Sequence, residues 1–360
     1  MTFVDATQEY EAWLGRHLEL VKEDLKVKHA QMRQAMFPFF RATYYRWAQR
    51  WAKVCDGLAE APAVLAVGDL HVENFGTWRD AEGRLIWGVN DFDEAWTLPY
   101  TSDLVRLASS AQVSALETQL RIGPYEAAEA IREGYEDSLK ADGRPLVLAE
   151  NNLDLRKMAV ERLRDPGKFW RKLQDIPTWK GTVPKLAAKG LVRELPQRGL
   201  EYRIVHRVAG LGSLGRPRFT AIAEWNGGQI AREAKALAPS AAAWAEKVKG
   251  TPPILYQQML ERAVRCPDPF LRMQGHWIVR RLAPDCSRIE LFDLPKASGE
   301  ARLLYYMGWE TANVHLGTRK AKKLLADLKK RKGKWLYEAS ERMVKATKTD
   351  WKEWRQASLQ

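Results

Sequence analysis

The chain has 360 residues, 46% of them hydrophobic, with a formal net charge of +13 and a mean hydropathy of −0.43. This length allows two lobes with a substantial core, and no apolar run approaches the length of a membrane span. Since the N-terminus also lacks a signal-peptide pattern, we expect a cytoplasmic protein. The three cysteines are widely spaced without a C-x-x-C pair, so the sequence suggests neither a disulfide framework nor a zinc knuckle.

The first 55 residues are predicted to be helical. Leu14, Leu18, Val21 and Leu25 recur at helical spacing, and Pro38 is expected to interrupt the chain before a second helix over 44–51. The aromatic residues of this second helix favour a place in the core, beneath the loop that follows.

Residues 67–103 form the most informative stretch, because polar side chains flank two predicted strands. Asp69, His71 and Asn74 precede the first strand, and Asp91 and Asp93 follow the second. The turn-rich residues 80–83 between the strands predict a hairpin. A hairpin of this length would return Asp91 close to Asn74.

The chemistry of this stretch favours a magnesium and phosphate site. Asn74 lies five residues after Asp69, the spacing of a phosphotransferase catalytic loop. Asp69 could accept the proton of an attacking hydroxyl, while Asn74 and Asp91, with Asp93 in addition, could supply magnesium ligands. Crowded carboxylates repel one another without a cation. The alternative is a solvated acidic turn.

His71 has two interpretations within the same loop. It could act as the general base, or it could order the loop by hydrogen bonding, which its two ring nitrogens suit. The ordering role is the favoured one.

A second candidate segment is the G-x-G-x-x-G run formed by Gly210, Gly212 and Gly215, with Ser213 inside it. Glycines let backbone amides approach phosphate oxygens closely. An alternating strand pattern over 219–225 and a turn at 226–228 follow, instead of the helix that a dinucleotide fold requires. Lys235, twenty residues past Gly215, is then expected on the next strand, where a kinase lysine would hold the α- and β-phosphates.

The remaining chain predicts mainly helices. We expect helices over 102–117, several between 125 and 189, one over 254–264, and mostly helix from Leu303 onward, with strands over 277–282 and 289–292. Residues 319–334 carry nine Lys or Arg against one Asp. A solvated helix face with Leu324, Leu325 and Leu328 buried is favoured over nucleic-acid binding, because no base-reading motif accompanies the charges.

These motifs together resemble the protein-kinase-like superfamily, in particular its aminoglycoside and choline phosphotransferase branch. The resemblance is carried by the G-D-L-H-x-x-N loop at 68–74, the acidic motif at Asp91 and the helix start at Asp103. More closely, the chain resembles the bacterial family named domain of unknown function 2252. That likeness rests on Pro38–Arg41, on N-D-F-D-E at 90–94 and on the glycine run, and it extends from about Phe37 to about His315.

The resemblance implies an α+β, protein-kinase-like fold with two lobes: a small antiparallel-sheet nucleotide lobe and a larger helical catalytic lobe. Because the glycine run follows the catalytic loop here, it also implies a circular permutation. The implied parts are a catalytic lobe over 1–195, a nucleotide lobe over 196–293 and C-terminal helices over 294–360 that return to the catalytic lobe.

By the same resemblance, Asp69 would be the catalytic base, Asn74 and Asp91 the magnesium ligands, and Lys235 the phosphate-binding lysine. Gly210, Gly212, Ser213 and Gly215 would cover the phosphates, and Asp103 would brace the catalytic loop. The glutamate that should pair with Lys235 is not evident; Glu246, Glu261 and Gln258 are candidates.

The function that these features predict is ATP- and magnesium-dependent phosphoryl transfer to an unknown hydroxyl acceptor, with a small molecule favoured. Two alternatives stay open. ATP bound in reverse would make the protein an AMP-transferring enzyme, and a chain without catalytic competence would be a nucleotide-sensing or nucleic-acid-binding protein. The sequence does not identify the acceptor.

Overall fold

The computed structural model describes residues 1–117, 120–149, 151–161, 163–289 and 297–357, and it has an α+β architecture with small antiparallel sheets. The N-terminal half holds helices α1 (Phe3–Leu14), α2 (Lys22–Gln34), α3 (Met36–Ala42), α4 (Tyr44–Val54), α5 (Tyr100–Glu117), α6 (Pro124–Lys140), α7 (Leu153–Val160) and α8 (Pro166–Gln174). The C-terminal half holds α9 (Lys185–Arg193), α10 (Ala241–Ala245), α11 (Tyr256–Arg262), α12 (Ala297–Leu316), α13 (Ala321–Leu328) and α14 (Trp335–Gln356).

The strands within the described residues form three sheets, and every strand pair in them is antiparallel. The first pairs β1 (Ala63–Ala66) with β4 (Trp96–Pro99). The second has the order β2 (Phe75–Arg79), β3 (Leu85–Val89) and β5 (Leu146–Val147). The third has five strands in the order β6 (Arg203–His206), β7 (Arg218–Trp225), β8 (Gly228–Ala236), β10 (Trp277–Leu282) and β9 (Arg272–Gln274).

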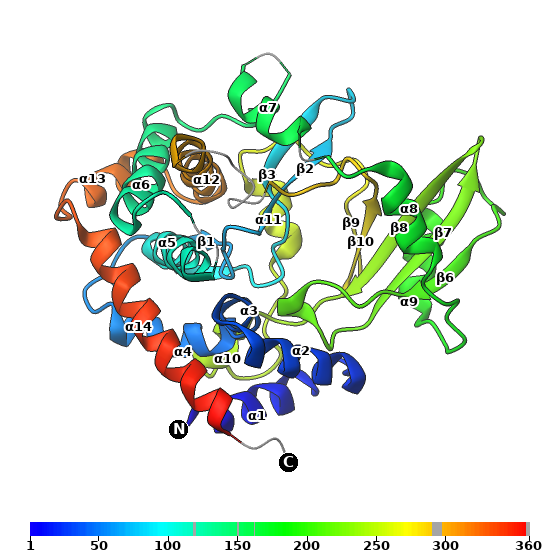
Figure 1. Cartoon of the computed structure of the whole chain (residues 1–360), viewed down its shortest axis with the longest axis horizontal. Coiled ribbons are helices and arrows are strands. Elements are labelled where there is room, and N and C mark those ends of the chain that lie inside the picture. The colour runs from blue at the N-terminus through cyan, green and yellow to red at the C-terminus, as the bar shows by residue number, and fades with distance from the viewer. Residues whose placement is uncertain (118–119, 150, 162, 290–296, 358–360) are drawn as a thin grey trace.

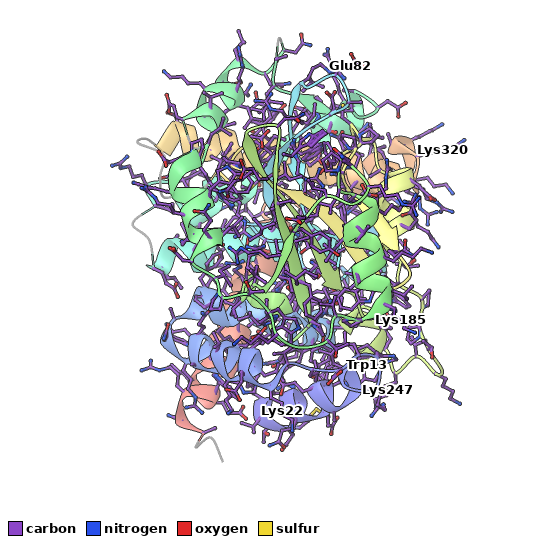
Figure 2. All side chains as sticks on the ribbon, turned by 90° about the vertical axis from the view of Figure 1, so that its right-hand side faces the viewer. Trp13, Lys22, Glu82, Lys185, Lys247 and Lys320 are labelled. Atoms are coloured by element: carbon purple, nitrogen blue, oxygen red, sulfur yellow. The ribbon has the colours of Figure 1, made fainter. Side chains whose placement is uncertain are left out.

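The five-stranded sheet lies on one side of the molecule and the long helices α5, α6, α12 and α14 lie on the other (Figure 1). The β2–β3 hairpin lies between them. The N-terminus and the C-terminal end of α14 lie at the same edge, where the backbone N–H of Phe3 donates to Glu353 Oε1 at 2.7 Å (Figure 1). Charged residues such as Lys22, Lys185 and Lys320 lie at the periphery (Figure 2).

The alternation of side chains along the strands determines what the five-stranded sheet presents to the rest of the chain. Phe219, Ala234 and Val279 lie on one face and pack against α9. Successive strand residues point to opposite faces, so Glu233 and Lys235 lie on the other face. Arg218 is paired with Lys235 in the sheet register, and Arg280 with Glu233. Four charged residues thus share the face that is turned away from α9.

Most predicted elements are confirmed. The hairpin at 75–89, the strand that carries Lys235, the strand over 277–282 and the helices over 44–51, 102–117 and 254–264 are all present within one to three residues. The turn between β7 and β8 has positive φ at Asn226 and Gly227, as a two-residue hairpin turn requires. In the basic segment, Leu324 and Leu328 are buried, Leu325 is half-buried and the lysines are exposed.

Two local predictions are wrong. Leu14 to Leu25 do not form one helix, because the chain breaks between α1 and α2 and the backbone N–H of Val21 donates to the carbonyl of Gly215 at 2.8 Å. Pro38 lies within the first turn of α3, where a missing N–H costs nothing. The strand expected over 289–292 lies mostly outside the described residues. In the part of the chain that the structure covers, no helix combines the length and apolarity needed to cross a membrane.

Candidate active site

The loop at 67–74 is held by the start of helix α5. The Asp103 carboxylate accepts the backbone N–H groups of Val67 at 2.7 Å and Gly68 at 2.9 Å, and its Oδ2 lies 3.0 Å from His315 Nε2. Gly68 has φ +81°, and a Cβ there would collide with the carbonyl of Glu94. Only glycine fits this position, and the bracing role that the resemblance implied for Asp103 is in place.

The hairpin brings Asp91 back to Asn74, as its length predicted. The backbone N–H of Asn90 donates to the carbonyl of Asn74 at 2.9 Å. The Asn74 side-chain Nδ2 donates to the carbonyls of Asp91 at 3.0 Å and Asp69 at 3.3 Å. These bonds leave the amide oxygen Oδ1 of Asn74 available to a ligand.

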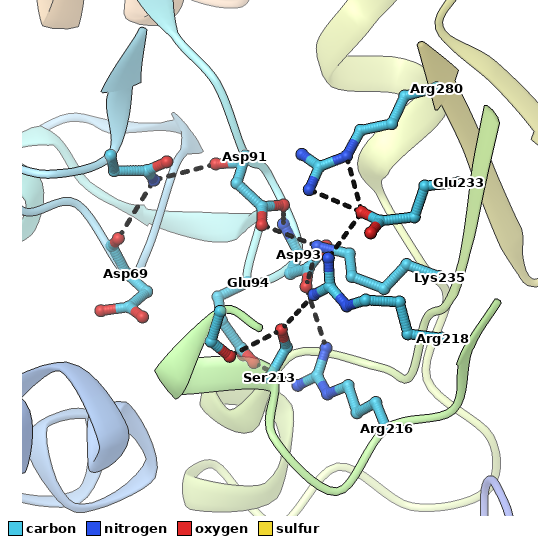
Figure 3. A network of polar contacts seen from close by, with 12 residues as sticks. Asp69, Asp91, Asp93, Glu94, Ser213, Arg216, Arg218, Glu233, Lys235 and Arg280 are labelled. Carbon is cyan, nitrogen blue, oxygen red and sulfur yellow. Dashed lines mark hydrogen bonds and ion pairs between the residues drawn. The ribbon is translucent and has the colours of Figure 1, made fainter. Parts of the chain in front are cut away.

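The two candidate segments meet at Lys235. Its Nζ lies 2.6 Å from Oδ2 of Asp91 and 2.6 Å from Oδ2 of Asp93, although these residues are more than 140 positions apart (Figure 3). The lysine is 1% exposed and lies behind the two carboxylates. It is therefore their counter-ion in this state and is not open to solvent.

None of the three residues considered as a partner of Lys235 has that role. Glu246 accepts from Trp96 Nε1 at 3.0 Å, Glu261 accepts from Gln257, and Gln258 is exposed. The lysine's partners are instead the two carboxylates that were predicted as metal ligands.

The two carboxylates differ in their electrostatics. Burial acts to raise the pKa of Asp91, but the charge of Lys235 outweighs it and holds that pKa below its usual value. Burial, followed by the neighbouring Asp91 carboxylate, raises the pKa of Asp93. Asp93 Oδ1 is buried and has no hydrogen-bond partner. Lys235 thus serves both carboxylates, and Arg216 Nη1 adds a longer contact of 3.5 Å to Asp93 Oδ2 while its Nη2 donates to Glu94 at 2.6 Å. The Oδ1 atom of Asp93 is left unsatisfied.

These donors fit a magnesium ion by their chemistry. Two carboxylates and an amide oxygen are hard ligands, and magnesium sites of few protein ligands are completed by phosphate and water. Among the residues that the structure describes, no three His, Cys, Asp or Glu side chains cluster into a metal site by themselves. A metal here would therefore depend on Asn74 and on non-protein ligands.

Asp69, the predicted base, is held by Arg106. The guanidinium donates to Asp69 Oδ1 through Nε at 2.9 Å and Nη2 at 2.5 Å, and it stacks on Phe40 with 4.1 Å to the ring centroid. Burial raises the pKa of Asp69, while the charges of Arg106 and Arg41 act in the opposite direction. Oδ2 remains available for a proton.

The glycine run covers Asp69. Gly210, Gly212 and Ser213 line the cavity in front of it, and a Cβ on Gly212 would lie 3.3 Å from Asp69 Oδ2 and 3.1 Å from the carbonyl of Arg41. Ser213 Oγ donates to the carbonyl of Gly210 at 3.1 Å, which fixes the loop. Gly215 does not line the cavity, because it packs against Leu25 of α2.

His71 hydrogen-bonds within the loop that carries it. Its Nδ1 accepts the backbone N–H of Glu73 at 3.2 Å. Burial, and then the charge of Arg41, lowers the pKa of His71 well below its usual value, so the ring is neutral. This geometry agrees with the ordering role.

A second ion cluster shares strand β8 with Lys235. Glu233 is fully buried, and its carboxylate contacts three guanidiniums: Arg207 at 2.5 Å, Arg218 at 2.6 Å and Arg280 at 2.9 Å. The charges of Arg207 and Arg218 hold the pKa of Glu233 well below its usual range, although burial opposes them. The cluster has three positive charges against one negative charge.

Many of these groups line one cavity of about 190 Å³, among them Asp69, Asn74, Asp91 and Asp93, while Lys235 and Glu233 lie behind its lining. Nine arginines and Lys28 line it, against six carboxylates. Sequence reasoning missed the arginines, because they are scattered over the chain and only the fold gathers them. One sequence signal could have pointed to one of these clusters. Glu233 and Lys235 are two positions apart on a predicted strand, so both side chains lie on the same face of the sheet.

Comparison with protein families gives one match. Residues 20–172 match the family described as "Uncharacterized protein conserved in bacteria (DUF2252)". This match supports the family resemblance over the stretch that carries Arg41, the 67–74 loop and the acidic motif. Searches of curated proteins and of solved structures returned no match.

Proposed function

We propose that the protein is an ATP- and magnesium-dependent phosphotransferase with a kinase-like, circularly permuted arrangement of its two halves. The observation that carries this proposal is the contact of Lys235 with Asp91 and Asp93, since it joins the segment of the glycine run to the acidic hairpin at one cavity. Magnesium ATP carries both a cation and a polyphosphate, and this cavity offers partners for each.

The residues of the chain would divide the work as follows. Asp69 would orient an acceptor hydroxyl and take its proton at Oδ2, with Arg106 holding the carboxylate in place. Asn74, Asp91 and Asp93 would hold magnesium, which supplies charge neutralisation of the phosphates. Lys235 would keep Asp91 charged and hold both aspartates in place, and the glycine run would exclude water. Catalysis of this type depends mostly on positioning and charge stabilisation.

The test is magnesium-dependent turnover of ATP by the wild-type protein and by Asp91→Asn. We expect the substitution to reduce transfer at least 100-fold, in the range of about 10²–10³ for loss of one charge-stabilising group. Full activity of the variant would contradict the proposal. Mass spectrometry of a modified acceptor separates phosphoryl transfer, about +80 Da, from AMP transfer, about +329 Da.

A further inference from the structure

Lys28 of helix α2 is a buried lysine without a counter-ion in the part of the chain that the structure describes. The helix turns Asp24, Lys28 and Met32 inward at a spacing of four residues, so all three lie on its buried face. Lys28 is 3% exposed and lines the same cavity as Asp69. Within the described ranges it forms no hydrogen bond or ion pair, and its Nζ lies 5.9 Å from the ring centroid of Tyr45.

The carboxylates near Lys28 are each bound to another residue. Burial lowers the pKa of Lys28, and the negative charges of Glu11, Glu94 and Asp69 oppose this effect without reversing it. Each of these carboxylates has a nearer cation, and so does Asp24 on the same helix face: Glu11 contacts His29 at 2.7 Å, Glu94 contacts Arg216 at 2.6 Å, Asp69 contacts Arg106 at 2.5 Å, and Asp24 contacts His206 at 3.1 Å. The chain therefore assigns none of its neighbouring carboxylates to Lys28.

A buried ammonium without a partner is costly for the folded protein. Removing a charge from water is repaid only when an opposite charge or a set of hydrogen bonds takes the place of water. A methionine, such as Met32 one turn further along α2, would fill a similar space without this cost. A ligand that brings an anionic group into the cavity would supply the partner that Lys28 lacks.

The position of Lys28 suits the phosphate that is transferred. Lys235 does not fill this role in the structure, because it is 1% exposed and its Nζ is occupied by Asp91 and Asp93. Asp69 is the proposed base, so the acceptor hydroxyl and the phosphorus atom that it attacks must both lie beside Asp69. Lys28 reaches the cavity from α2, within the electrostatic influence of Asp69, and Gly212 of the glycine run lines the same cavity.

We propose that Lys28 is a catalytic residue that binds the terminal phosphate of ATP. This inference rests on the proposed function and names the residue that would neutralise the transferred group. In the transfer, the acceptor oxygen bonds to phosphorus while the bond to the ADP oxygen breaks, and the hydroxyl proton passes to Asp69 Oδ2. Negative charge is spread over the three equatorial oxygens during this step. The Lys28 ammonium is a compact cation with three donors and would contact these oxygens.

The experiment compares two nucleotides that differ by the terminal phosphate. Calorimetric titrations measure the binding of ADP and of the non-hydrolysable ATP analogue AMP-PNP, both with saturating magnesium, to the wild-type protein and to Lys28→Met. Methionine keeps an unbranched apolar side chain and removes the charge. We expect the affinity for AMP-PNP to fall at least about tenfold and the affinity for ADP to stay within about twofold.

A control variant and a stability measurement separate ligand binding from a structural role. Lys26→Met removes the same charge from a side chain of α2 that is 73% exposed, and should leave both affinities unchanged. Because Lys28 has no counter-ion among the described residues, Lys28→Met should unfold at a urea concentration no lower than that of the wild type. A lower urea midpoint together with equal losses of affinity for the two nucleotides would assign Lys28 to the fold and overturn the proposal.

Failure of this inference differs from failure of the proposed function. If the wild type binds magnesium AMP-PNP and Lys28→Met binds it equally well, the role of Lys28 is overturned and the phosphotransferase proposal stays intact. If the wild type binds neither nucleotide, the proposed function is overturned, and the role of Lys28 with it.

Discussion

Two neighbouring ion clusters on strand β8 have opposite imbalances. At Lys235, one ammonium meets two carboxylates, Asp91 and Asp93; at Glu233, two residues earlier, one carboxylate meets three guanidiniums. A protein that needed these groups only for stability would gain most from matched pairs, because unpaired buried charges are costly. The acid-rich cluster suits a cation and the base-rich cluster suits an anion, and magnesium ATP supplies both.

The largest expected effect is that of Glu233→Gln, which removes the carboxylate that Arg207, Arg218 and Arg280 share. Because Glu233 is fully buried, we expect a loss of about 3–5 kcal/mol in the free energy of unfolding, measured by urea denaturation. Added phosphate should restore part of it. Glu224→Gln, at an exposed position of β7, is the control and should change stability by less than about 0.5 kcal/mol. Equal losses in the two variants would mean that Glu233 balances no charge.

The acid-rich cluster is tested by Lys235→Met, which leaves Asp91 and Asp93 with only the longer contact of Arg216 to Asp93, at 3.5 Å. Because Asp91 is one-third exposed, we expect the free energy of unfolding to fall by about 2 kcal/mol, which is less than the loss for a fully buried pair. Millimolar magnesium should stabilise this variant more than the wild type, because the ion replaces the lost ammonium. Lys26→Met removes an exposed ion pair with Glu23, and magnesium should stabilise this control variant no more than it stabilises the wild type. A variant indifferent to magnesium would argue against a cation site.

Removal of one guanidinium should have a smaller effect on stability. In Arg280→Gln, Arg207 and Arg218 still contact Glu233, so we expect the free energy of unfolding to change by no more than about 1 kcal/mol. Its affinity for magnesium ATP should nevertheless fall about tenfold, the equivalent of about 1.4 kcal/mol. Unchanged nucleotide affinity in a titration would show that the base-rich cluster is structural.

The smallest expected effect concerns the glycine run. In Gly212→Ala the added Cβ would press on the Arg41 carbonyl at 3.1 Å and on Asp69 Oδ2 at 3.3 Å. We expect a stability loss below about 1 kcal/mol, with a larger relative loss of turnover than in Gly333→Ala, which has open space around it. Equal turnover in the two variants would show that the glycine run does not affect the reacting groups.

Local patterns predicted much of this site and little of its charge balance. The hairpin, its turn and the strand of Lys235 follow from alternation and turn residues, which act over a few positions. The convergence of Asp91 with Lys235 came from the family resemblance, since spacing along the chain says nothing about a contact across 144 residues. Glu233 and Arg288 carry no motif, and their partners are set by packing alone. Arg106 lies in the helix-start motif at Asp103, but that motif did not reveal its pairing with Asp69.

The break between α1 and α2 shows the same limit. Leu14 and Leu25 fit one helical stripe, but tertiary contacts decide otherwise: Val21 donates its backbone N–H to Gly215, and Leu25 packs on the same glycine. A local pattern could not reveal that this segment supports the end of the glycine run.

The central claim is that one cavity takes a cation at Asp91 and Asp93 and a polyphosphate at the neighbouring arginines. Calorimetric titration of the wild-type protein with ATP, with magnesium and with magnesium ATP tests it most directly. The account predicts that magnesium ATP binds at least tenfold more tightly than ATP in the presence of a chelator. Absent binding of ATP in all conditions, or equal affinity with and without magnesium, would contradict it.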